Sequence, residues 1–487
     1  MVSPKFPLYE RPFWLITLSL IFILVVSQLV QDGMFMDGLL YVCVSKNLAN
    51  GLGTFWHPHF SKTCMSVFHE QPPLYFGLLA LFYKVFGESL YVERFFCLVT
   101  LVITALYIHK IWKIVFRGDA MNIGNSWLPV LLWITIPVCF WSYSNLVEET
   151  VMSVFTIISI YYILKGLVLE KNQVLNILIG AFFVFLASLT KGFQGLFPCV
   201  AVSLYWIFNH RNFPFKKGVL FTLILVLLPA MLYALLLRNP VIYASYELYF
   251  KTRLIDAFNT KATVSTTGNR FELLFRLFCE LLPALVVSVF VFVFGKVKKV
   301  PVRKSSFLKF VVWFFVIGLS GSLPLMVTLE QREFYLTTSF PFFSIALAIF
   351  ITPVVSAFQN KMEVSKKSFQ VFYFSSCVFL AGSIMYCMLQ LGGFSRDKIL
   401  LKDIYTMNRI IPYGETISIP GDMWNDWSIR MYFNRYNYVS LEDVNVRQCH
   451  FYLARKNSVL APVLANYDRV PLKTDVLELY ELREVNN

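Results

Sequence analysis

Charged residues are scarce in this chain. Only 15% of its 487 residues are charged and 57% are hydrophobic, with 49 Phe, 25 Tyr and 10 Trp, whereas a soluble protein carries about 25% charged residues. Apolar stretches near 20 residues long recur along the sequence, and a helix of about 20 residues crosses a hydrocarbon core. The composition excludes a soluble globular protein and predicts a polytopic membrane protein.

The sequence also lacks a recognisable signal-peptide cleavage site and an internal repeat. The first apolar run, 12–31, is too long for a signal-peptide core and lacks a small-residue cleavage site, so we expect a retained first helix. No internal repeat is visible, which disfavours a transporter built on inverted repeats. The net charge of +14 does not require nucleic acid as a partner, because Lys and Arg are concentrated in short loops on one side of the membrane.

Hydropathy predicts about eleven transmembrane helices, within a range of about 11–13. They are expected at 12–31, 92–112, 127–144, 147–169, 174–190, 195–209, 218–237, 274–295, 308–328, 334–354 and 369–391. The basic loops place the N-terminus in the cytoplasm, and an odd number of spans then places the segment after 392 on the opposite side.

The segment 393–487 is less apolar than the rest of the chain. The runs "ETISIPG", "YNYVSLE", "HFYLAR" and "VLELYEL" alternate as strands do, and "MWNDWSIRMYFNRY" has the pattern of an amphipathic helix. We therefore expect two domains: an all-α membrane domain over 1–392 and a small soluble α/β domain over 393–487.

The first outer loop, 32–91, holds the densest group of polar side chains. Segments 34–49 and 73–87 have the pattern of helices that lie in the interface. Asp37 is in the first of them, with Tyr41 one turn later on the same face, and Glu70 lies just ahead of the second. In the same loop, Cys43 and Cys64 could form a disulfide or remain free thiols.

Six motifs in this order resemble the GT-C glycosyltransferases, most nearly the protein O-mannosyltransferase and lipid A aminoarabinose transferase type. In the first outer loop, "MDGLLY", "TFWHPHF" and "FHEQPPLYFG" are similar to the family's D-E-x-x-Y, W-x-x-P and E-K-P-P-L patterns. Later in the chain, "NLVEETVMSVF" (145–155), "LTKGFQGLFP" (189–198) and "EQREFYLTTSFPFF" (330–343) also resemble family segments. The chain departs from the pattern at Gly38 and Gln71, where the family has an acid and a lysine.

This resemblance implies a GT-C fold, with interfacial helices in the first outer loop and an outer C-terminal domain. It implies a sugar donor carried on a polyprenyl (undecaprenyl) phosphate. Asp37 is the expected base that activates the acceptor. The donor is a phosphodiester whose leaving group is a polyprenyl phosphate, and this group needs cations and hydrogen-bond donors rather than an acid. Lys191, Arg332 and Tyr335 are expected to bind that phosphate, because all three fall at outer helix ends.

The outer loop 238–273 is aromatic, basic and long for a plain connection. It could close over the donor or the acceptor. Arg253, Lys261 and Arg270 are its candidate phosphate contacts.

Other residues are expected to support the reaction. Glu70 could orient the acceptor or bind a divalent ion. A metal site could be formed by His57, His59, His69 and Glu70, although their spacing matches no standard zinc motif, and no cofactor is otherwise indicated. We expect contacts with the substrate, or with the residues that bind it, from Tyr41, His69, Gln71 and Glu148.

The predicted function is transfer of a sugar to a lipid, glycan or protein acceptor at the non-cytoplasmic face, within membrane lipids and without nucleic acid. The expected compartment is a bacterial inner membrane with the C-terminal domain in the periplasm, although an endoplasmic reticulum membrane fits the same hydropathy. Two alternatives remain: a transporter, flippase or ligase for lipid-linked saccharides, and a non-catalytic scaffold. Spans without charge at their centres disfavour a transporter, and charges gathered on one face disfavour a scaffold.

Overall fold

The computed structural model describes residues 8–251, 266–300, 307–456 and 462–483. The chain divides into two compact units. The helical unit comprises Met1–Ser27, Glu70–Pro72 and Cys97–Leu391, and the mixed unit comprises Gln28–His69, Pro73–Phe96 and Gly392–Asn487. Most of the first outer loop therefore groups with the C-terminal segment.

Nine helical segments of the described residues are long and apolar enough to cross a membrane: Leu8–Leu29, Leu90–Val115, Glu148–Val168, Gln173–Asn209, Phe215–Leu236, Glu272–Val297, Leu308–Val327, Phe340–Gln359 and Lys367–Gln390. Their elements are η1 (Leu8–Glu10), α1 (Arg11–Ile21), η2 (Phe22–Val26), α2 (Ser27–Leu29), α5 (Leu90–Val115), α8 (Glu148–Val168), α9 (Gln173–Lys191), η3 (Gly192–Val200), α10 (Ala201–Asn209), α11 (Phe215–Leu236), α14 (Glu272–Val297), α15 (Leu308–Ser322), η5 (Leu323–Val327), α16 (Phe340–Gln359) and α17 (Lys367–Gln390).

The count of nine differs from the eleven expected segments at two places. First, the segment Gln173–Asn209 reverses direction after Lys191. Gly192 has φ +71°, and a Cβ on Gly195 would lie 2.5 Å from the carbonyl oxygen of Ala187, so η3 folds back onto the end of α9. The two expected helices 174–190 and 195–209 are therefore present as consecutive arms of one apolar segment.

Second, the expected span 127–144 consists of two short helices, α6 (Trp127–Ile134) and α7 (Pro137–Ser142). The break has a local cause. Pro137 has no N–H to donate to the preceding turn, and it forces Ile136 into an extended conformation (φ −72°, ψ 122°). Neither piece alone is long enough to cross a bilayer.

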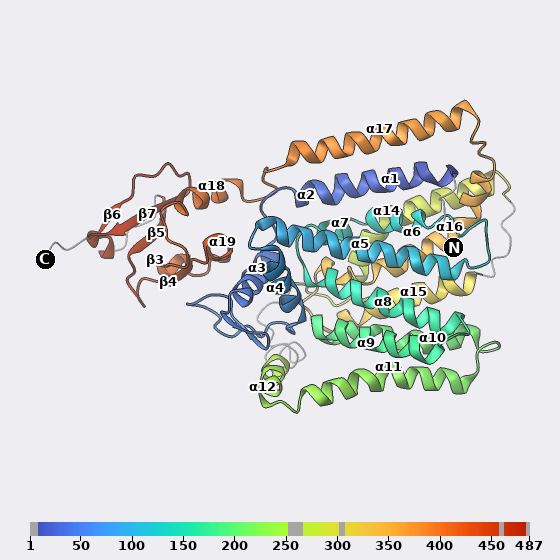
Figure 1. The fold of residues 1–487 in the computed structure, drawn as a ribbon, viewed down its shortest axis with the longest axis horizontal. Helices are drawn as coiled ribbons and strands as arrows, with labels where there is room; N and C mark the ends of the chain where they lie inside the picture. The colour runs from blue at the N-terminus through green and yellow to red at the C-terminus, as the bar shows by residue number, and fades with distance from the viewer. Residues whose placement is uncertain (1–7, 252–265, 301–306, 457–461, 484–487) are drawn as a thin grey trace. The chain divides into compact units, whose positions relative to one another are not determined.

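The centre of the helical unit is formed by α8 and α16. In each of them 72% of the most apolar stretch is buried, against 17% for α11 and α17. The outer helices expose apolar side chains such as Phe290, Phe374 and Met388, as expected where lipid replaces water. Figure 1 shows the long helices of this unit running alongside one another. The prediction of a polytopic all-α membrane domain is confirmed.

The mixed unit contains helices at both places where the sequence predicted them in 32–91. They are α3 (Met36–Ala49) and α4 (Leu74–Phe86). Between them, β1 (Gly53–Thr54) and β2 (His57–Pro58) form a short antiparallel hairpin. The two helices pack through aromatic rings, because Tyr41 of α3 lies 5.5 Å from Tyr75 and 5.6 Å from Phe76 of α4, measured between ring centroids.

The C-terminal part of the mixed unit is a small α/β domain. Its elements are α18 (Lys398–Met407), β3 (Thr416–Ile419), η7 (Gly421–Met423), α19 (Trp427–Asn437), β4 (Ser440–Asp443), β5 (Phe451–Arg455), η8 (Pro462–Asn466), β6 (Tyr467–Arg469) and β7 (Leu477–Leu482). The strand order is β4-β3-β5-β7-β6, with β3 parallel to β4 and β5, and β7 antiparallel to β5 and β6. The four expected strands and the expected helix are confirmed, whereas α18 and β6 were not predicted.

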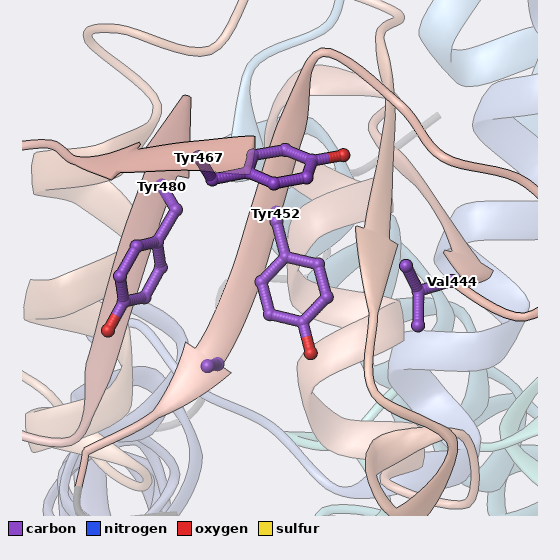
Figure 2. Packing of buried hydrophobic residues seen from close by; sticks show 5 residues of the cluster. Val444, Tyr452, Tyr467 and Tyr480 are labelled. Atoms are coloured by element: carbon purple, nitrogen blue, oxygen red, sulfur yellow. The ribbon is translucent and has the colours of Figure 1, made fainter. Parts of the chain in front are cut away.

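One face of this sheet is covered by a small apolar cluster. Figure 2 shows Tyr452, Tyr467 and Tyr480 beside Val444, and Ala454 completes the cluster. The Tyr467 hydroxyl donates a hydrogen bond of 2.6 Å to the carbonyl of Cys449. The Tyr480 hydroxyl donates to Glu478 at 2.7 Å. Aromatic packing, with these two hydroxyls hydrogen-bonded, thus stabilises the domain.

The structure also bears on the expected disulfide and on the loop 238–273. All nine cysteines are free thiols, and Cys43 is buried with its thiol donating to the carbonyl of Met431 at 3.2 Å, so the Cys43–Cys64 disulfide is absent. The loop 238–273 contains a helix, α12 (Pro240–Tyr249). Arg253 and Lys261 lie outside the described residues.

Candidate functional site

Three of the motifs found in the sequence meet in the helical unit. Glu148 and Glu149 begin α8, Lys191 ends α9, and Tyr335 lies in η6 (Glu333–Leu336), just before α16. The Lys191 ammonium forms a hydrogen-bonded ion pair with Glu149 and lies 3.9 Å from a carboxylate oxygen of Glu148. Both glutamates are fully buried, and the Lys191 side chain is only 9% exposed.

Aromatic and amide groups complete what we call the Lys191 cluster (Glu148, Glu149, Lys191, Gln194 and Tyr335). The Lys191 ammonium lies 4.5 Å from the centroid of the Tyr335 ring, within cation–π range. The Gln194 amide donates to the backbone carbonyl of Tyr335 at 2.6 Å. The buried Lys191 ammonium thus lies between two carboxylates and the ring of Tyr335, and Gln194 holds the backbone of Tyr335 in place.

The turn after Lys191 depends on a close contact with α12. Tyr249 is the last residue of α12, and a Cβ on Gly192 would lie 2.5 Å from the Tyr249 hydroxyl oxygen. Glycine is required at 192 for two reasons. A side chain would collide with Tyr249, and the φ of +71° disfavours other residues. The loop that the sequence marked as functional therefore touches the Lys191 turn through Tyr249, a residue that sequence reasoning did not single out.

A second polar group lies beside η6. Arg276 of α14 forms ion pairs with Glu272 and Glu333. Arg332, the residue before Glu333, is partly exposed, and Arg270 is exposed. The Arg270 backbone carbonyl accepts a 3.0 Å hydrogen bond from Gln331. Arg332 and Arg270 thus lie on segments tied to η6, but no contact among the described residues places either side chain in the Lys191 cluster.

In the mixed unit, Asp37 occupies the first turn of α3 and is partly buried. Tyr41, one turn later, is buried against α4. The aromatic packing of Tyr41 fixes the rotation of α3, and through it the direction in which the first turn presents Asp37.

The residues ahead of α4 follow the predicted arrangement. His69 and Gln71 are partly buried, and the buried Pro73 occupies the N-cap position of α4. The His69 ring lies 5.5 Å from the His57 ring. Burial, and next the neighbouring His57, lower the pKa of His69 below its ordinary value of 6.5, which favours the neutral imidazole.

Within the described residues, no group of three or more His, Cys, Asp or Glu side chains could hold a metal ion. The His57, His59, His69 and Glu70 site therefore has no preformed geometry in these residues. Metal binding there stays a prediction.

A buried charged group in the mixed unit was missed by sequence reasoning. We call it the Arg435 network (Asp32, Glu93, Tyr405, Arg435 and Tyr436). Arg435 of α19 donates to Asp32 at 2.8 Å and to Glu93 at 2.9 Å, and both tyrosine hydroxyls donate to Asp32. Burial alone raises the pKa of Asp32, but Arg435 and the two tyrosines outweigh it and hold the pKa at about 2.

The sequence and the structure were compared with those of known proteins. Residues 70–243 match the family model described as dolichyl-phosphate-mannose-protein mannosyltransferase. The structure is similar to that of ArnT from Cupriavidus metallidurans bound to undecaprenyl phosphate, with a TM-score of 0.61 and 12% identity over 94% of this chain and 96% of that chain. The chain has the GT-C fold. The resemblance indicated by the motifs is thereby confirmed.

The apo state of the same ArnT gives a TM-score of 0.60 and 12% identity, over 94% of this chain and 95% of that one. The apo oligosaccharyltransferase of Archaeoglobus fulgidus gives 0.49 and 11%, over 93% and 70%. No curated protein sequence matches the chain. With its apolar helices, this GT-C chain is an integral membrane protein.

Proposed function

We propose that this protein is a membrane glycosyltransferase that transfers a sugar from a polyprenyl phosphate to an acceptor at the non-cytoplasmic face. The observation that carries the proposal is the Lys191 cluster, a buried cation at one end of an ArnT-like helical fold. A lipid-borne phosphate needs such a cation near a bilayer surface, since an uncompensated charge at that depth is costly. The acceptor is a lipid, a glycan or a protein.

The donor phosphate is held by Lys191 in this proposal. Its ammonium has three N–H donors, so it can remain paired with Glu149 while it contacts a phosphate oxygen. The Tyr335 ring stabilises the cation from one side, and Arg332 and Arg270 supply further positive charge. As the sugar–phosphate bond breaks, these groups stabilise the departing polyprenyl phosphate.

Asp37 acts as the base toward the acceptor hydroxyl or amine. A carboxylate also stabilises the positive charge that develops on the sugar ring in the transition state. Glu70 orients the acceptor or binds a divalent ion, with His69 and Gln71 beside it in sequence. Glu148 supports the donor site through Lys191, and Tyr41 supports Asp37 through the packing of α3.

The test is transfer of a labelled sugar by purified protein reconstituted in liposomes. Undecaprenyl-phosphate hexoses and pentoses serve as donors and a membrane extract serves as acceptor, and released undecaprenyl phosphate is quantified. We expect Asp37→Asn to lower kcat by about 10²–10⁴-fold with little change in KM for the donor. The matched control is Asp422→Asn, which alters an exposed acid of the C-terminal domain.

Equal turnover by wild type and Asp37→Asn would remove Asp37 as the base. Movement of the donor lipid between leaflets, without any sugar transfer, would favour the flippase alternative over the enzyme.

A further inference from the structure

The segment between α2 and α3 is fixed by the C-terminal domain through backbone contacts. Asp32 N–H donates to Gly393 O at 2.9 Å, and Ser395 N–H donates to Asp32 O at 2.8 Å, which forms a parallel bridge between Asp32 and Phe394. Gly33 has φ +86°, and a Cβ there would lie 2.5 Å from the carbonyl oxygen of Arg396. The path of the chain into α3 is therefore set by residues 392–396.

The Arg435 network fixes the same segment through side chains. The Arg435 side chain is 2% exposed and bridges Asp32, just ahead of α3, and Glu93, in the first turn of α5. The next residue of α5, Arg94, donates to Gly33 O at 2.7 Å. Three separate parts of the mixed unit thus converge on two consecutive residues, Asp32 and Gly33.

The far half of α3 is held by the same helix, α19. The Lys46 ammonium donates to the backbone carbonyl of Arg435 at 2.6 Å and lies 4.6 Å from the centroid of the Tyr438 ring. Asn47 donates to the side chain of Asn434 at 3.3 Å, and the Cys43 thiol donates to the carbonyl of Met431. The helix that carries Asp37 is thus bound to α19 by polar contacts at its far end and by Arg435 just before its start.

Burial of these charges is an expensive way to stabilise a domain, because desolvation offsets most of the attraction between the charges. Apolar side chains of similar volume would pack as favourably. Ion pairs and fixed hydrogen bonds instead define how segments are arranged. A guanidinium that must bind two carboxylates from different segments allows only one arrangement of those segments.

From this geometry we propose that Arg435 is a positioning residue for sugar transfer. It sets the start of α3, and hence the place at which the first turn presents Asp37, so that the C-terminal domain is part of the catalytic apparatus. This inference rests on the proposed function, in which Asp37 is the base. Arg435 acts through Asp32 and α3 and needs no contact with either substrate.

The experiment compares Arg435→Lys with a matched variant in the full-length protein. Lysine keeps the charge but cannot bind two carboxylates as a planar guanidinium does. The matched variant is Asp403→Asn. Asp403 is 2% exposed and accepts hydrogen bonds from the backbone N–H groups of Asp475, Val476 and Leu477 at 2.7, 2.7 and 2.9 Å, so its contacts stay within the C-terminal domain.

Two readouts are measured: backbone hydrogen exchange, and kcat and KM for the donor. We expect Arg435→Lys to speed exchange over 36–49 and to lower kcat by about 10- to 100-fold while KM for the donor stays within about twofold. Asp403→Asn should speed exchange at 475–477 and leave kcat near that of the wild type. If Arg435→Lys does not fold, Glu93→Gln keeps an acceptor for Arg435 and should give a smaller effect in the same direction.

Unchanged exchange over 36–49 would overturn the proposal whether or not the protein transfers sugar. Faster exchange at these residues with an unchanged kcat would also overturn it. A wild-type protein without transferase activity would instead refute the proposed function, while hydrogen exchange still decides whether Arg435 holds α3.

Discussion

At the scale of residues, two buried cations of this protein lie beside buried carboxylates. Lys191 lies against Glu149, and Arg435 lies between Asp32 and Glu93. Such pairs contribute little net stability, yet removal of one partner leaves an uncompensated buried charge. Single substitutions at these positions should therefore have large effects.

For Lys191, we predict different results for Lys191→Met and Lys191→Arg. Methionine removes the cation, so KM for the polyprenyl phosphate donor should rise by about 10- to 100-fold, as expected for loss of one charge-assisted hydrogen bond. The free energy of unfolding should fall by about 3 kcal/mol because Glu149 stays buried. Arginine should retain most of the donor affinity. Steady-state kinetics and thermal unfolding check both effects, with Lys84→Met at an exposed position of α4 as control.

For Asp32, we predict a loss of stability in acid. Its pKa is about 2 in the folded protein against an ordinary value of 3.8, so the stabilisation is fully present above pH 4 and is lost as the pH falls from about 4 to about 2. The difference corresponds to about 2 kcal/mol. Arg435 stays charged throughout this range, and Tyr405 and Tyr436 stay neutral because burial raises the pKa of each.

The measurement is thermal unfolding in detergent between pH 6 and pH 2.5. The wild-type melting temperature should fall more steeply below pH 4 than that of Asp32→Asn. Parallel curves for the two proteins would contradict the assigned role of Asp32.

The sequence revealed one of these two charged groups and not the other. Glu148, Lys191 and Tyr335 lie in motifs that resemble family segments, and the helical unit brings them together. Asp32 and Arg435 carry no such signal, because each resembles an ordinary surface residue. Their pairing depends on tertiary contacts between residues 403 positions apart, which local pattern cannot indicate.

At the scale of elements, the turn between α9 and η3 is the part of the site most sensitive to backbone change. We predict that Gly192→Ala lowers both stability and transfer, since a Cβ would meet the Tyr249 hydroxyl and the positive φ is disfavoured. Gly118→Ala is the control, because Gly118 also has a positive φ (+84°) but has open space around its Cβ position.

Comparing the two variants separates the effect of backbone strain at a positive φ from the effect of the contact with Tyr249. Gly118→Ala should cost about 1 kcal/mol and leave kcat unchanged, whereas Gly192→Ala should cost more and lower kcat. Equal effects of the two substitutions on unfolding and on transfer would mean that the Tyr249 contact has no role.

Helices with a strong pattern were predicted within a few residues. The helices α3 and α4 begin and end within two residues of the expected 34–49 and 73–87. The span 127–144 was predicted less well, because a hydropathy window averages over Pro137 and does not register the break it causes. The helix α18 was not predicted; it is only ten residues long.

At the scale of the whole molecule, the orientation in the membrane is still a prediction. We expect Gln71→Cys, in a background in which Cys64 is Ser and Cys279 is Ala, to react with a membrane-impermeant maleimide added outside intact cells. Met121→Cys, in the exposed loop between α5 and α6, should react only after permeabilisation. The reverse pattern would place the proposed site on the cytoplasmic side.

The fold class was predictable because composition and hydropathy report directly on the bilayer as solvent. The grouping of most of the first outer loop with the C-terminal segment was not predictable. It depends on contacts such as Gly33 against Arg396 and Cys43 against Met431, and nothing in the local sequence of either segment points to its partner.

The bridge between Asp32 and Phe394 has a consequence for biosynthesis. The Ser395 hydroxyl donates to the Asp32 carbonyl across 363 residues of sequence. At ordinary translation rates the ribosome takes about 20 to 70 s to make that stretch. During this time the nascent chain has inserted its first helix but lacks the partner strand and the arginine that its first loop needs. Maturation of this loop therefore waits until residues 392–436 have been made, and nascent chains stalled before residue 392 should remain open to proteases at residues 28–35.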